Sequence, residues 1–184
     1  DTILIVTADH GEELMERGNV GHASTTAAGT LFEESVRVPL FIWWPRGLTP
    51  ALAERPSDHL DIMPTVLDAL GRGGQAALPG STLTGARNST EWYAVTSKAG
   101  FAEADPDAVK DFIAAVAEGR WKLVVRAQRR EVIDAQLYDL SADPQERRDL
   151  ARTRPDIVSQ MLPKLTGRLA TLTIPDKGPR RVSW

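Results

Sequence analysis

The amino-acid sequence predicts an α/β protein with a smaller α+β part at its carboxyl end. The apolar run Ile3–Val6 stands directly before a polar segment, which is typical of a buried strand in a mostly parallel sheet. Apolar residues recur at helical spacing between residues 60 and 70. After residue 88 the pattern changes to short strands followed by one long helix, which favours a separate α+β subdomain.

The first part, residues 1–88, is expected to belong to the larger α/β domain. Residues 2–8 form its first strand and residues 36–44 its second. Between them, residues 9–30 form a loop rich in Gly, Ala and Thr, and loops of this length are usually functional. Residues 31–35 are predicted to form a short helix.

A longer helix is predicted over residues 61–70. Pro64 falls in its first turn, where proline is tolerated, and Gly71 ends it. The residues from 71 to 88 are again rich in Gly, Ala and Thr. They are interpreted as a linker into the second part of the chain.

The second part, residues 89–184, is predicted to be an antiparallel sheet followed by a helix. The candidate strands are residues 93–96, 112–117, 121–126 and 135–140. Gly119 and its neighbours suit a hairpin turn between the second and third of these strands. The helix is expected to begin near Pro155 and to bend at Pro163.

The composition is that of an ordinary globular protein and excludes several classes. The formal net charge is -3 and 26% of the residues are charged, so nothing indicates a nucleic-acid partner. No apolar run in this segment reaches the length of a membrane span. The sequence has no cysteine, which excludes disulfides, thiolate metal ligands and a cysteine nucleophile within these residues. No oligomeric state or compartment follows from these properties.

The residues directly after the first strand are the first candidates for chemistry. Ligands of open α/β sheets bind beyond the carboxyl ends of the strands, and this is where Asp9 and His10 stand. Carboxylate and imidazole are both metal ligands, and Gly11 lets the backbone turn sharply beside them. The two residues therefore predict half of a metal site. The sequence also allows an aspartate that caps a turn and a histidine that packs at a sheet edge.

The other two histidines differ in their surroundings. His22 lies in the same loop as Asp9 and His10, and a histidine near a metal can act as a general acid or bind an anionic oxygen. A histidine on a surface loop is the plain alternative. His59 stands just before the predicted helix at Asp61 and is interpreted as a structural cap.

Several charged residues are assigned structural roles. Glu33 and Glu34 are expected to form ion pairs with Arg37 that fasten the loop to the second strand. A catalytic pair of carboxylates is the less favoured interpretation. Lys122 lies on a predicted strand, where a lysine usually points to water, although it could also reach an anion.

Three stretches of the sequence together resemble the sulfatase family of the alkaline phosphatase superfamily. Their order and spacing are similar to those in the carboxyl-terminal portion of a sulfatase, and the resemblance covers nearly the whole chain up to Thr171. The stretches are Ile5-Val6-Thr7-Ala8-Asp9-His10-Gly11-Glu12 with Gly21-His22, then Leu31–Ile42 with His59–Gly71, and finally Gly119–Val124 with Leu137–Leu140, Asp143-Pro144, Glu146 and Asp149–Ala151.

The resemblance implies an alkaline-phosphatase-like sheet and the metal-dependent hydrolysis of sulfate esters, carried by small molecules or glycans. It places Asp9 and His10 among the ligands of a divalent metal ion, with calcium first and manganese or zinc as alternatives. It places His22 where the family has a residue that contacts the sulfate or the leaving-group oxygen. The sulfur of the ester is attacked in that family by a metal-bound nucleophile, usually the hydrate of a formylglycine made from Cys or Ser.

The family's nucleophile motif, Cys/Ser-x-Pro-x-Arg, does not occur in these residues. The chain is therefore expected to be the carboxyl-terminal portion of a larger enzyme and to be inactive alone. Its first strand would lack neighbours of a central sheet, so we expect exposed apolar surface, and aggregation or dye binding by the segment alone.

Two alternatives stay open at this point. A phosphonate or phosphodiester hydrolase, or a phosphoethanolamine transferase, of the same superfamily suits Asp9, His10 and His22 almost as well. A non-catalytic binding or scaffold domain would keep the fold without the metal.

Overall fold

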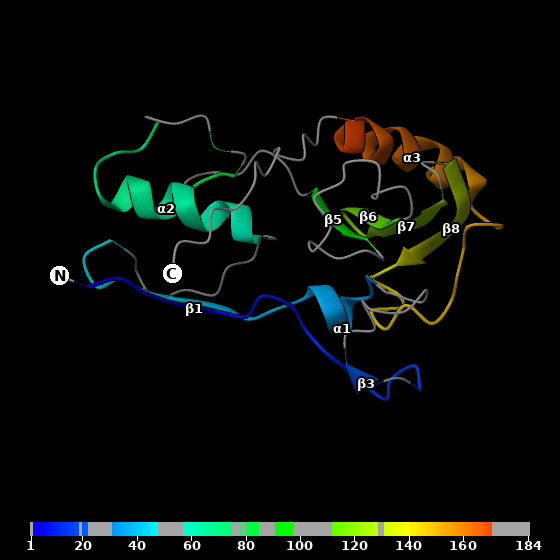
Figure 1. The fold of residues 1–184 in the computed structure, drawn as a ribbon, viewed down its shortest axis with the longest axis horizontal. Coiled ribbons are helices and arrows are strands. Elements are labelled where there is room, and N and C mark those ends of the chain that lie inside the picture. Colours follow the sequence, from blue (N-terminus) through cyan, green and yellow to red (C-terminus); the bar gives the residue numbers. More distant parts are fainter. Residues whose placement is uncertain are drawn as a thin grey trace, which may run out of the picture. The chain divides into compact units, whose positions relative to one another are not determined.

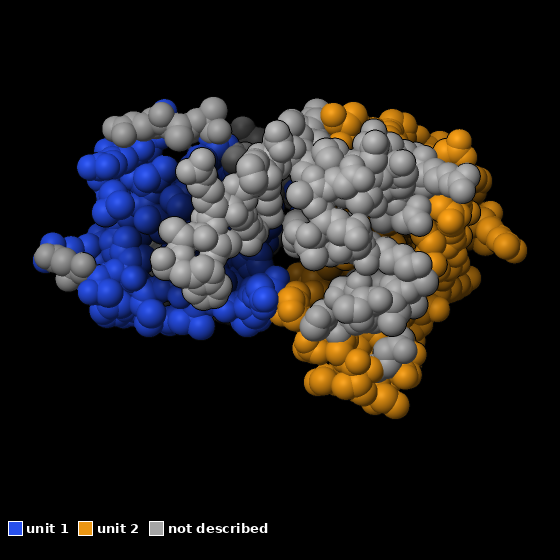
Figure 2. Space-filling model, viewed as in Figure 1, with its two compact units in different colours: residues 1–9, 38–92, 117–119 blue, residues 10–37, 93–116, 120–184 orange. Residues whose placement is uncertain are grey.

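A computed structural model of the chain describes residues 2–18, 20–21, 31–47, 57–74, 78, 80–84, 91–97, 112–128 and 131–170. The chain forms two compact units, each assembled from separate stretches of sequence (Figure 2). Unit 1 comprises residues 1–9, 38–92 and 117–119, and unit 2 comprises residues 10–37, 93–116 and 120–184. None of the helices in these described stretches has the length and apolar character needed to cross a bilayer.

Unit 1 contains a two-stranded sheet and a helix. The strand β1 (Leu4–Thr7), labelled in Figure 1, pairs with β4 (Leu40–Trp43). In this pairing Leu4 lies opposite Trp43. The helix α2 (Ile62–Ala69) continues from a short 3₁₀ turn, η1 (His59–Asp61). Pro64 falls in the first turn of α2 and Gly71 follows its end with a φ of 68°, as the sequence predicts.

The residue that caps η1, the turn leading into α2, is Asp58, so the interpretation of His59 as the cap is wrong. The side chain of Asp58 accepts a hydrogen bond from Leu60 N at 2.8 Å, and Asp61 Oδ2 accepts one from Asp58 N at 3.2 Å. This reciprocal pair is a capping box, which satisfies two donors at the helix start. His59 is exposed, and its Nε2 lies 3.4 Å from Thr7 Oγ1.

The prediction that the first strand is buried in a parallel sheet is wrong for β1 in the described structure. β1 runs antiparallel to β4, and the side chains of Leu4 and Val6 are 49% and 51% exposed. An unbroken apolar run is compatible with two covered faces, but it does not encode the direction of the neighbouring strand or what covers each face.

The main sheet of unit 2 has four strands and is covered by one long helix. The strands are β5 (Trp92–Ser97), β6 (Phe112–Glu118), β7 (Trp121–Gln128) and β8 (Glu131–Asp139), which lie side by side in that order. β7 and β8 are antiparallel, with an irregularity between Arg126 and Ala127. β6 and β7 flank a turn at Gly119, whose φ of 59° favours glycine.

The helix α3 (Pro155–Ala170) packs against this sheet (Figure 1). It runs through Pro163 as one helix. Its buried side chains and those of β6, β7 and β8 form the core of the unit: Ala114, Val116, Leu123, Val125, Leu137, Met161 and Leu165. These residues alternate along the strands, so one face of the sheet is directed at the helix.

Unit 2 also includes the described part of the loop that follows β1. Two short strands, β2 (Glu13–Leu14) and β3 (Val20–Gly21), pair antiparallel. A one-turn helix, α1 (Glu33–Val36), begins two residues later than the short helix predicted from the sequence. The segment that carries His10 is therefore grouped with the carboxyl-terminal sheet.

Candidate functional site

Asp9 and His10 follow β1 after a single intervening residue, and both side chains are exposed. Asp9 belongs to unit 1 and His10 to unit 2. His10 Nδ1 lies 2.8 Å from the carbonyl oxygen of Gly11 and 3.8 Å from Glu12 Oε1. Because a carbonyl oxygen can only accept, this contact assigns the proton of the neutral ring to Nδ1. The lone pair of the ring then lies on Nε2.

This tautomer fits a metal ligand. A histidine that binds a metal typically donates its other ring N–H to a carboxylate or a backbone carbonyl, which fixes the orientation of the ring. Asp9 supplies an exposed carboxylate directly before it in the chain. A carboxylate with an imidazole suits manganese and zinc, and oxygen ligands suit calcium.

The two residues do not make a complete ion site by themselves. Within the stretches that the structure describes, no group of three or more His, Cys, Asp or Glu side chains is placed to hold a metal ion. A divalent cation in a protein normally takes four or more ligands. A site at Asp9 and His10 therefore needs ligands from elsewhere.

His22 lies outside the described residues. Its predicted role near the leaving group therefore stays a prediction. The chain enters the undescribed stretch directly after Gly21, the last residue of β3.

Gly11 ties the residue after His10 to the short helix α1. Its backbone N–H donates to the carbonyl oxygen of Ser35 at 2.9 Å. A Cβ atom at this position would lie 2.0 Å from the carbonyl oxygen of Glu34. Only glycine allows this close approach of the two backbones.

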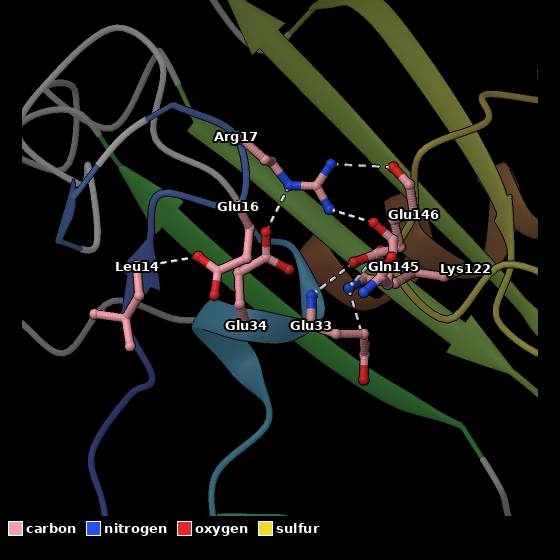
Figure 3. Close-up of polar contacts among 8 residues, drawn as sticks. All are labelled: Leu14, Glu16, Arg17, Glu33, Glu34, Lys122, Gln145 and Glu146. Atoms are coloured by element: carbon pink, nitrogen blue, oxygen red, sulfur yellow. Dashed lines mark hydrogen bonds and ion pairs between the residues drawn. The ribbon is translucent and has the colours of Figure 1, made fainter.

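A buried ionic cluster also contacts α1, at its first residue, Glu33 (Figure 3). Lys122 Nζ on β7 is 3.0 Å from Glu33 Oε1 and 2.8 Å from Glu146 Oε1. The side chains of Lys122 and Glu146 are fully buried. The expectation that Lys122 points to water is therefore wrong, because the side chain instead meets two carboxylates inside the protein.

The carboxylates of α1 each find a basic partner other than the expected one. Glu33 pairs with Lys122, and Glu34 Oε1 accepts from Arg17 Nε at 2.6 Å. The prediction that both pair with Arg37 is wrong: sequence proximity suggested the partner, whereas the tertiary fold brings in residues from distant segments.

Arg17 also bridges to the turn that follows β8 (Figure 3). Its Nη1 donates to the carbonyl oxygen of Glu146 at 3.1 Å and its Nη2 to that of Gln145 at 2.7 Å. The guanidinium lies 3.4 Å from the centre of the Phe32 ring, an arrangement that adds a cation–π attraction. Together these contacts hold the start of α1 against the 145–146 turn.

Burial is the main influence on the Glu146 carboxyl. It raises the pKa of Glu146, and the ammonium group of Lys122 acts in the opposite direction. Both effects are those expected for a carboxylate that leaves water and gains one cationic partner. The sequence signal that could have located this cluster is a lysine in the middle of the apolar run Trp121–Val125.

Comparison with known proteins finds sulfatases among the relatives of this chain. The family model described as Sulfatase matches residues 1–72, which include Asp9 and His10. The choline-sulfatase of Rhizobium meliloti (strain 1021) is 34% identical over 154 residues, which are 82% of this chain. Mouse (Mus musculus) arylsulfatase K is 33% identical over 175 residues, which are 89% of this chain.

A crystal structure of a candidate sulfatase from Bacteroides fragilis is similar to this chain with a TM-score of 0.70 over 91% of it. The sequence identity is 20%, so this likeness shows the fold alone. The chain spans 27% of the choline-sulfatase, 29% of the arylsulfatase K and 35% of the solved chain.

Proposed function

We propose a function from one premise: the chain belongs to the sulfatase family. We infer that its residues form the carboxyl-terminal part of a metal-dependent enzyme that hydrolyses sulfate esters of small molecules or glycans. The observation that carries this proposal is the Asp9–His10 pair. It lies within the matched family segment, directly after a strand, with the imidazole in the tautomer that suits metal binding.

Asp9 and His10 are the residues that would hold the ion. The carboxylate of Asp9 brings a negative charge to the cation, and His10 presents Nε2 while its Nδ1–H is engaged by the Gly11 carbonyl. When bound, a divalent cation would polarise the sulfuryl oxygens and stabilise the charge that develops on them. Calcium is the first candidate, and manganese and zinc are the alternatives.

His22 is proposed as the general acid. The reaction breaks the bond between sulfur and the ester oxygen, and the departing alkoxide oxygen needs a proton. A neutral-pH acid such as an imidazolium is suited to supply it. Gly21 is the described residue next to it, and the backbone hydrogen-bond pairing of β2 and β3 anchors that end of the loop.

The nucleophile is proposed to come from a segment other than these residues, as a hydroxyl of a formylglycine hydrate, which forms the bond to sulfur as the ester oxygen leaves. The match to about a quarter of the choline-sulfatase, 27%, supports this division. The apolar face of β1 and β4 supports it as well, because Leu4, Val6, Phe41 and Trp43 are each about half exposed. Such a face is typical of a surface that another segment covers.

The proposal is tested on the complete gene product with 4-nitrophenyl sulfate as substrate. We expect chelation by EDTA to abolish hydrolysis and calcium or manganese to restore it. Asp9→Asn should lower kcat/KM by about 100-fold or more, as loss of a metal ligand does. Asp134→Asn, at an exposed carboxylate of β8, is the matched control and should stay within about twofold.

Other outcomes separate the alternatives. Hydrolysis of bis(4-nitrophenyl) phosphate at a higher kcat/KM than the sulfate would favour phosphoryl chemistry. A protein that binds none of the three cations by calorimetry, and is unaffected by Asp9→Asn, would favour a scaffold role.

A further inference from the structure

We propose that the buried ionic cluster of Lys122, Glu33 and Glu146 is a positioning device that sets the place and orientation of the His10 imidazole. The inference rests on the proposed function of His10 as a metal ligand. It gives Lys122, on strand β7, a role in the geometry of a site at His10, more than a hundred residues earlier in the sequence. Lys122 is a positioning residue in this view, because it acts through α1.

The first step is the link from β7 to α1 (Figure 3). Lys122 Nζ reaches Glu33 Oε1 at 3.0 Å and Glu146 Oε1 at 2.8 Å. Glu146 Oε2 in turn accepts a hydrogen bond from the backbone N–H of Glu33 at 2.6 Å. Two groups therefore fix the first residue of α1: Lys122 holds its side chain and Glu146 holds its backbone N–H. Charge-assisted contacts of this kind are short and directional.

The second step is the link from α1 to His10. The carbonyl oxygen of Ser35, on α1, accepts the N–H of Gly11 at 2.9 Å. The approach is so close that a side chain at Gly11 would overlap the carbonyl oxygen of Glu34. The carbonyl oxygen of Gly11 then holds His10 Nδ1 at 2.8 Å. A shift of α1 thus moves the group that orients the imidazole.

The backbone at Glu146 indicates that its side chain is required where it stands. Glu146 has a φ of 52°, a conformation that glycine adopts without cost and other residues adopt rarely. A glutamate at this position is accounted for by the two contacts that its carboxylate makes inside the protein.

The energetics of buried charges favour a positioning role over a purely stabilising one. Apolar side chains of similar volume would often stabilise a fold as well as a buried ion pair does. An ion pair differs from apolar packing in that it is satisfied in one geometry only. A lysine between two carboxylates therefore selects one position of α1 among those that simple packing would allow.

Arg17 also contacts this helix, and it shares Glu146 with the cluster. It joins Glu34 to the carbonyl oxygens of Gln145 and Glu146. The cluster contacts Glu33, and Arg17 contacts Glu34, the next residue of α1. Each set of contacts therefore limits a rotation of α1 that the other set alone would allow.

The test compares Lys122→Met with Leu165→Ala in the complete gene product. Leu165 is a residue of α3 that is 1% exposed in the core between α3 and the sheet. Its truncation therefore destabilises unit 2 without removing a contact of the cluster. The first measurement is titration calorimetry with manganese chloride, well below both melting temperatures. We expect Lys122→Met to weaken binding about 10- to 100-fold, the range found when a residue that supports a metal ligand is lost. Leu165→Ala should stay within about twofold.

The second measurement needs no metal. The ¹⁵N shifts of the His10 ring, assigned with His10→Asn, report which nitrogen carries the proton. We expect the Nδ1–H form in the parent protein and in Leu165→Ala, and a mixture of tautomers in Lys122→Met. The milder variant Glu33→Gln retains an acceptor for Lys122 and should give a smaller change in the same direction if Lys122→Met fails to fold.

The outcomes separate the two proposals. Equal losses of metal affinity in Lys122→Met and Leu165→Ala, or unchanged His10 tautomers in the cluster variants, would overturn the positioning role. If the parent protein binds no metal, the proposed function fails, and the ring shifts alone decide whether the cluster orients His10.

Discussion

The two larger sheets of the described structure are built from similar apolar side chains and place them in opposite environments. In unit 2, Leu123, Val125 and Leu137 are at most 1% exposed beneath α3. In unit 1, Leu4 and Val6 on β1 are about half exposed, as are Phe41 and Trp43, which lie opposite them on β4. The difference is the presence of a covering element.

This contrast teaches that the two units depend on their surroundings to different degrees. Burial removes apolar surface from water and stabilises a fold in proportion to the area removed. The sheet of unit 2 gains this from its own helix. The β1–β4 face gains it only when another surface is placed on it.

The largest expected effect separates two leucines on strands. Leu123→Ala on β7 should lower the free energy of unfolding by about 2–5 kcal/mol, because it leaves a cavity in a closed core. Leu4→Ala on β1 should cost less than about 1 kcal/mol, since half of that side chain already meets water. Urea denaturation of the 184-residue chain by itself, followed by circular dichroism, measures both. Equal losses would mean that β1 is covered in solution, and the contrast between the units would fail.

A smaller effect is expected at two glycines of unit 2. Gly11→Ala should destabilise by about 1–3 kcal/mol, because its Cβ would lie 2.0 Å from the carbonyl oxygen of Glu34 and one backbone has to move. Gly167→Ala, in α3 with no atom within 4 Å of the added carbon, should stabilise by about 0.5–1 kcal/mol.

The same denaturation experiment gives both values, and the opposite signs are the critical result. A neutral Gly11→Ala would show that α1 is free to shift away from Gly11. That result would also remove the second step in the positioning of His10.

Local signals made the elements of unit 2 predictable from the sequence. The strands around Gly119 were expected because a turn residue separates two apolar runs. The start of β8 was missed because Glu131 and Asp134 interrupt the apolar pattern. Their cross-strand partners lie on β7, and a single strand's sequence does not contain its partner.

The candidate site was predictable only in the part that is local. Asp9 and His10 were singled out because they follow a strand, which is information within a few residues, and their role as metal ligands stays a prediction. The buried position of Lys122 was missed because its partner Glu33 lies 89 residues away. The direction of β1 was missed for the same reason, since β4 comes after a loop whose path the pattern does not encode.

A modest change in stability is expected on the open face of unit 1. Val6 and Phe41 lie directly opposite each other, and both are about half exposed. Replacing both with threonine should lower the free energy of unfolding by about 1 kcal/mol, because threonine favours strands and only the buried half of each apolar side chain is lost. The binding of a hydrophobic dye should nevertheless fall by roughly half, since the exposed apolar patch is what such dyes occupy.

The matched control replaces Ile5 and Ile42 with threonine. These two residues are the pair on the opposite face of the same two strands. Both are less exposed than Val6 and Phe41, so the double threonine variant should lose more stability and leave dye binding unchanged or raise it. If dye binding falls equally in both double variants, the dye does not recognise the face of Leu4, Val6, Phe41 and Trp43. The exposed face would then no longer be an argument that another segment covers it. The metal site proposed at Asp9 and His10 would be unaffected.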